Sequence, residues 1–172
     1  MTLTIQEIWV CLNLLIAFLV LIITPKFYVD CLRKCLSIKG SLIGVALAFV
    51  AICFSLLLSK YIPSGNGNPY TASVYLVISV IILLPLFVKC ETEIFQRFLI
   101  EKLGKIGIPV SSVIFGAAHA IQNLNLLSGV VLTFVGAVFA VSYVKGGFKL
   151  TASIHYFYDL TLLVLLLVSY LF

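Results

Sequence analysis

Long apolar runs, separated by short segments rich in charge, glycine or proline, dominate the sequence. The clearest run, residues 73–88, contains no charged residue. A helix of about 20 apolar residues can cross the hydrocarbon core of a bilayer, because all its backbone groups are hydrogen-bonded internally. The composition points the same way, since 63% of the 172 residues are hydrophobic and 10% are charged, whereas a soluble domain has about 25% charged residues. The sequence therefore predicts a helical membrane protein.

The breaks between the apolar runs predict an all-α, polytopic bundle of about six transmembrane helices. Pro25, the segment 63–69 with its prolines and glycines, and the pair Gly146-Gly147 are residues that end helices. The expected spans are residues 8–24, 41–59, a run from 71 into the charged segment after 88, 108–121, 126–144 and 150–172. We expect residues 1–172 to form a single membrane domain.

Basic residues are distributed unevenly over the predicted connections. The loops after the first, third and fifth spans share one side and hold ten of the eleven lysines and arginines, namely Lys26, Arg33, Lys34, Lys39, Lys89, Arg97, Lys102, Lys105, Lys145 and Lys149. The other side has only Lys60. Because short basic loops stay in the cytoplasm, we predict a multi-pass protein with these loops cytoplasmic and both termini outside. The net charge of +5 therefore reports on membrane topology. We expect the lipid bilayer, and no nucleic acid, to be the partner of these basic loops.

Three of the predicted spans carry ionisable side chains within or next to apolar sequence. In chain order they are Glu91, Glu93, Arg97, His119, His155 and Asp159, and the two histidines are the only ones in the chain. A spacing of four places Glu93 with Arg97, and His155 with Asp159, on one helix face. Ionisable groups at membrane depth are expensive and usually functional, so we expect Glu93, Arg97, His119, His155 and Asp159 to line one polar cavity. The alternative is that the segment after residue 88 is a solvated connector.

This set of side chains suits hydrolysis without a serine or cysteine nucleophile. A carboxylate beside a histidine can deprotonate water, and a second histidine can donate to a developing oxyanion. Asp159 would orient His155, and Arg97 would keep Glu93 ionised. Two histidines and a carboxylate can also bind Zn²⁺, but no H-E-x-x-H is present, so we expect no cofactor. A proton-coupled carrier would use the same groups.

The three motifs, in this order on successive helices, resemble those of the CPBP family. That family comprises the type II CAAX prenyl endopeptidases and the bacteriocin-processing and immunity (Abi) proteins. The motifs run from Thr92 to Arg97, from Phe115 to His119 and from His155 to Asp159, within a core of residues 73–165. The resemblance implies an intramembrane endopeptidase that cleaves a membrane-associated peptide or protein with activated water. The alternative is a non-catalytic relative that acts in bacteriocin self-immunity or as a membrane scaffold.

The first motif departs from the family pattern. It normally opens with two adjacent glutamates, and the resemblance implies that the first is the base that works with the histidine of the second motif. Thr92 stands at that place here, Glu93 follows it, and Glu91 lies one residue early. Glu91 and Glu93 are about 200° apart on a helix, so only one can face His119. We predict that Glu93 is the base, because its register matches Arg97. Further candidates for the site are Glu91, Thr92 and Asn123.

Overall fold

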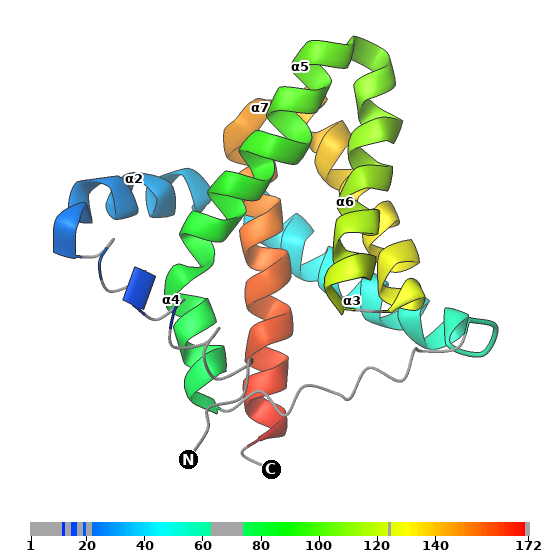
Figure 1. Cartoon of the computed structure of the whole chain (residues 1–172), viewed down its shortest axis with the longest axis horizontal. Coiled ribbons are helices and arrows are strands. Elements are labelled where there is room, and N and C mark those ends of the chain that lie inside the picture. The colour runs from blue at the N-terminus through cyan, green and yellow to red at the C-terminus, as the bar shows by residue number, and fades with distance from the viewer. Residues whose placement is uncertain are drawn as a thin grey trace.

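The computed structural model describes residues 22–62, 74–123 and 125–170, together with Leu12, Leu15, Ile16 and Leu19, and gives the backbone alone at residues 75, 76, 122 and 123. Within these ranges the elements are α2 (Pro25–Cys35), α3 (Ile38–Leu58), α4 (Val74–Glu91), the π-helix η1 (Thr92–Phe98), α5 (Leu99–Leu103), the 3-10 turn η2 (Gly104–Ile106), α6 (Gly107–Asn123) and α7 (Leu126–Ser169) (Figure 1). The described part of the chain contains no strand, so the all-α prediction is confirmed.

Two of the described helices are long and apolar enough to cross a membrane, and they are α3 and α7. The count of six spans stays a prediction, because most of the first expected span and the segment 63–73 lie outside the described residues. α7 joins the fifth and sixth expected spans, but its direction breaks at Gly147, where φ is 69° and ψ is −169°. Glycine is the residue that adopts this conformation at little cost. The helix break therefore lies within the predicted Gly146-Gly147 pair.

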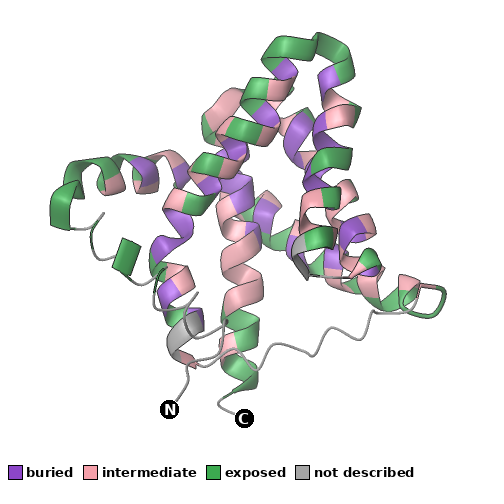
Figure 2. Ribbon diagram, in the orientation of Figure 1, coloured by how far each residue is buried: buried purple, intermediate pink, exposed green. Residues whose placement is uncertain are grey.

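α7 forms the centre of the bundle (Figure 1). It packs against α2, α3, α4, α6 and η1. Figure 2 shows buried residues where α7 meets its neighbours, whereas the C-terminal end of α7 is exposed. Residues 151–155 are all buried. Two glycines of α3 allow its close approach to α7, since a Cβ at Gly40 would collide with Ser153, and one at Gly44 with the Ile154 carbonyl. Small residues have this role in many membrane helix pairs.

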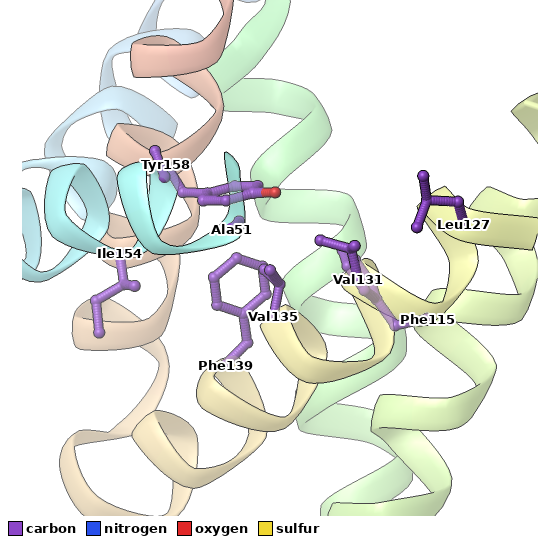
Figure 3. Packing of buried hydrophobic residues seen from close by; sticks show 9 residues of the cluster. Ala51, Phe115, Leu127, Val131, Val135, Phe139, Ile154 and Tyr158 are labelled. Atoms are coloured by element: carbon purple, nitrogen blue, oxygen red, sulfur yellow. The ribbon is translucent and has the colours of Figure 1, made fainter. Parts of the chain in front are cut away.

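The largest apolar cluster joins the two halves of α7 to α3 and α6 (Figure 3). Phe139, in the first half of α7, is fully buried. Its ring meets Phe115 of α6 edge-on at 5.7 Å and Tyr158, in the second half of α7, at 5.9 Å. It also stacks on the ring of His155 at 4.4 Å. One of the two histidines is therefore part of the packed core.

α2 corrects the expectation that residues 26–40 form only a connecting loop. It is a helix that attaches to α4 close to Pro85, which lies inside α4. A proline has no N–H and disturbs the hydrogen bonds of the preceding turn. The hydroxyl of Tyr28 donates to the backbone carbonyl of Ile82 at 2.8 Å. This hydrogen bond attaches α2 to the turn of α4 that precedes Pro85.

The segment after α4 is a π-helix rather than a continued α-helix. Its i→i+5 hydrogen bonds widen the turn and rotate the side chains that follow, and such segments are frequent at functional sites. Thr92 and Gln96, four residues apart, are fully buried and face the bundle. Glu93 and Arg97 are partly exposed on another side of η1. The π-helix therefore separates the residues of the first motif into an inner and an outer set.

Candidate active site

Four ionisable side chains from three helices meet inside the bundle. Glu91 is the last residue of α4, His119 lies in α6, and His155 and Asp159 lie one turn apart in α7. The Glu91 Oε2 atom is 3.5 Å from His155 Nε2 and 4.0 Å from His119 Nε2. His155 Nε2 is also 3.2 Å from Asp159 Oδ2. The structure thus brings both histidines and Asp159 together, with Glu91 as their common neighbour. We call these four residues the acid–histidine cluster.

Glu93 and Arg97 lie outside this cluster, so the expectation that Glu93 faces His119 is wrong. Arg97 Nη1 is 3.2 Å from Glu93 Oε2, and Arg97 Nε is 3.3 Å from Glu101 Oε1. The side chain of Arg97 is 50% exposed. Burying an arginine–glutamate pair has a desolvation cost that its mutual attraction often fails to offset. The pair therefore stays on the outer side, and Glu91, on roughly the opposite face, turns inward.

The outer residues form a network of their own. Tyr143, in the first half of α7, donates its hydroxyl to Glu101 Oε1 at 2.7 Å. Arg97 bridges Glu101 and Glu93. This network ties η1 and α5 to α7 near the Gly147 break. Its geometry suits a structural link between helices.

One hydrogen bond fixes the tautomer of His119. Its Nδ1 atom lies 2.8 Å from the backbone carbonyl oxygen of Phe115. A carbonyl only accepts, so Nδ1 carries the hydrogen and Nε2 of the neutral ring is an acceptor. Glu91 Oε2 is a second acceptor 4.0 Å away. A water molecule about 2.8 Å from both atoms can donate one hydrogen to each, which leaves its lone pairs directed elsewhere.

His155 lies between the two carboxylates. Its side chain is 2% exposed, and its Nε2 atom faces both Glu91 and Asp159. Its Nδ1 atom is buried without a hydrogen-bond partner among the described residues. The single N–H of the neutral ring is therefore directed at the carboxylates. This placement does not fit the expected donation to an oxyanion, because His155 has no free N–H to offer a substrate.

A cavity of about 320 Å³ lies beside the acid–histidine cluster, between α3, α6 and α7. Its lining consists of Ala51, Ile52, Ser55, Phe115, His119, Ser128, Val131, Leu132, Tyr158, Asp159 and Leu162. Of the five residues expected to share a cavity, only His119 and Asp159 line it. Tyr158 is a polar residue of this wall that the sequence analysis missed. Its position inside the motif that starts at His155 was the available signal.

The remaining candidates have different environments. Thr92 is fully buried, and its hydroxyl has no hydrogen-bond partner among the described residues; the same holds for the side-chain amide of Gln96. The side chain of Asn123 lies outside what the structure describes. Within the described ranges, no three histidine, cysteine or acidic side chains are arranged to hold a metal ion.

Two of the described helices have membrane length. A partly buried cluster of two carboxylates and two histidines lies beside a cavity. Together these features define a helical membrane protein with an acid–histidine site. Residues 70–161 match the family described as type II CAAX prenyl endopeptidase Rce1-like. The chain belongs to this family of membrane endopeptidases, which confirms the resemblance seen in the sequence. No curated protein and no solved structure matches the chain.

Proposed function

We propose that the protein is a membrane endopeptidase that hydrolyses a peptide bond with water activated by Glu91 and His119. The observation that carries this proposal is the pair of acceptors, Glu91 Oε2 and His119 Nε2, 4.0 Å apart next to a cavity. The family supports the reaction class, because it is a protease family. The substrate is a membrane-associated peptide or protein.

The reaction follows from the hydrogen-bonding roles of these groups. A water molecule donates to Glu91 and His119 and attacks the carbonyl carbon of the peptide, and Glu91 takes one of its protons as general base. The proton then passes to the leaving amine as the C–N bond breaks. His155 and Asp159 hold the Glu91 carboxylate in position. Tyr158 lines the cavity, and its hydroxyl is the proposed donor to the oxyanion.

The second candidate is a non-catalytic relative that acts in bacteriocin self-immunity or as a membrane scaffold. The observation that favours it is Thr92, a buried residue where the family motif has a glutamate. A hydroxyl can hold water but has no accessible deprotonated form at neutral pH. In this case the cavity would bind a peptide without cleaving it.

For the topology, we propose a multi-pass protein with its basic loops in the cytoplasm and both termini outside. The uneven distribution of lysine and arginine supports this orientation. The hydrogen bond from Tyr143 to Glu101 adds support, because it links the residues before the Gly147 break to α5. The connections that follow the third and fifth expected spans therefore lie at one end of the bundle.

Cleavage by the purified protein in proteoliposomes distinguishes the two candidates. A set of membrane-associated peptides, some lipid-modified and some resembling leader peptides, is incubated with the protein, and mass spectrometry identifies the products. We expect specific cleavage by the natural protein and a loss of about 10²- to 10⁴-fold for His119→Gln, the usual range for general acid–base catalysis. Peptide binding at the same affinity by both proteins, without cleavage by either, would favour the second candidate.

A further inference from the structure

Helix α2 carries a charged face. Successive residues of a helix are rotated by about 100°, so residues three or four apart share a face. Lys26, Asp30, Arg33 and Lys34 follow this spacing. Asp30 forms an ion pair with Lys34 at 2.8 Å. Lys26 and Arg33 therefore give this face a net positive charge.

A second face docks α2 onto the bundle. Cys31 and Cys35 are fully buried, and α2 packs against α4 and α7. Tyr28, on the same side, donates to the Ile82 carbonyl of α4 at 2.8 Å. This docking fixes which way the other faces of α2 point.

The third face is apolar and exposed. Val29 is 43% exposed, and Leu32, which shares its face, is partly exposed. Leu36, the residue that follows α2, is 47% exposed. Figure 2 shows exposed residues along much of the outer side of α2. Adjacent charged and apolar faces on an exposed helix are typical of a helix in the membrane interface, with basic side chains among the headgroups and apolar ones toward the acyl chains.

The orientation of α2 fits the same position. Figure 1 shows α2 extending sideways, across the direction of α4 and of the C-terminal half of α7. A helix in this orientation lies along the membrane plane when the long helices cross the bilayer. Lys89, near the end of α4, has its Nζ atom 4.0 Å from the centroid of the Phe27 ring. It adds a further cation at the level of α2.

We propose that α2 is an interfacial helix that binds the headgroups of anionic phospholipids through Lys26, Arg33 and Lys89. Phosphate groups at the surface of a membrane attract such clusters of basic residues. Glu91 follows Lys89 by two residues, roughly 3 Å along the helix. Lipid binding at α2 therefore holds the acid–histidine cluster close to the level of the headgroups. This inference does not depend on peptide cleavage.

The depth of α2 is measurable by tryptophan fluorescence, because the chain has one tryptophan. In a Trp9→Phe background, Val29→Trp places the probe on the apolar face and Arg33→Trp on the charged face. The proteins are reconstituted in vesicles of phosphatidylglycerol and phosphatidylcholine. We expect brominated acyl chains to quench the tryptophan fluorescence of the Val29→Trp protein more strongly than aqueous iodide does. For the Arg33→Trp protein we expect iodide to be the stronger quencher. The same order of quenching for both probes would overturn the interfacial position.

Headgroup binding is tested by thermal unfolding in neutral detergent micelles with added lipid. We expect phosphatidylglycerol to raise the unfolding midpoint of the natural protein above the value in phosphatidylcholine. The double variant Lys26→Gln/Arg33→Gln should lose most of this difference, whereas the matched control Lys102→Gln/Lys105→Gln should keep it. An equal loss in both variants, or the same rise with inorganic phosphate, would contradict a lipid site at α2.

Discussion

At the scale of single residues, the His155 side chain positions two carboxylates with one imidazole. Its Nε2 atom is 3.2 Å from Asp159 and 3.5 Å from Glu91, and its ring is held by stacking on Phe139. A neutral imidazole has one N–H, so the two carboxylates share it. Asp159 therefore influences the position and charge of Glu91 through the shared His155 N–H, without a direct hydrogen bond to Glu91.

This arrangement predicts the effect of Asp159→Asn. The amide keeps the shape of the side chain and removes the charge that orients the His155 N–H. We expect kcat for peptide cleavage to fall at least about tenfold, with little change in KM, because the loss affects transition-state stabilisation. Glu101→Gln on the outer surface is the matched control and should keep its rate. Full activity of Asp159→Asn would show that Asp159 plays no part in the cluster.

At the scale of elements, α2 and η1 are the two parts of the fold that differ from the prediction. α2 is attached to α4 by the hydrogen bond from the Tyr28 hydroxyl to the Ile82 carbonyl. η1 directs Thr92 and Gln96 inward while Arg97 points outward. The π turn of η1 departs from regular α-helix, and α2 is attached to the turn of α4 that precedes Pro85.

The anchor of α2 predicts the effect of Tyr28→Phe. The substitution removes one hydrogen bond and keeps the ring, so the free energy of unfolding should fall by about 1 kcal/mol. The same substitution at Tyr61, which is 83% exposed, is the matched control and should have almost no effect. Thermal unfolding in one detergent measures both. Equal stability of the two variants would mean that the Tyr28 hydroxyl does not hold α2.

Neither of these elements could be read from the sequence. The apolar runs and the Gly146-Gly147 pair predicted helices and the break in α7, because length and hydrophobicity decide which segments form membrane helices. Residues 26–40 looked like a loop because their charges interrupt the apolar pattern. The π turn of η1 has no sequence signature in its seven residues, so the sequence predicts an ordinary α-helix there.

At the scale of the whole molecule, residues distant in sequence meet because α7, which carries His155 and Asp159, packs against both α4 and α6. The sequence predicted that both histidines and Asp159 would share a site, since isolated ionisable groups are costly in a membrane. The sequence-based prediction was wrong about which of Glu91 and Glu93 faces His119. The spacing of Glu93 and Arg97 predicts an ion pair within the site, whereas in the structure Arg97 pairs with Glu93 and Glu101 on the outer surface.

The overall topology is tested by cysteine accessibility in intact cells. In a background with Cys11, Cys53 and Cys90 replaced by serine, we expect Asn66→Cys to react with a membrane-impermeant maleimide added outside. Lys105→Cys, in the connection between α5 and α6, is the control and should react only after the membrane is opened. Labelling of Lys105→Cys from outside, with Asn66→Cys reacting only after the membrane is opened, would contradict the proposed orientation.

The central claim is that Glu91, not Glu93, activates water together with His119. The most direct test is the rate of peptide cleavage by Glu91→Gln and Glu93→Gln, which each replace one carboxylate oxygen by an amide nitrogen. We predict that Glu91→Gln loses about 10²- to 10⁴-fold in rate, and that Glu93→Gln, which alters only the outer ion pair, keeps most of the activity. An inactive Glu93→Gln beside an active Glu91→Gln would contradict the account.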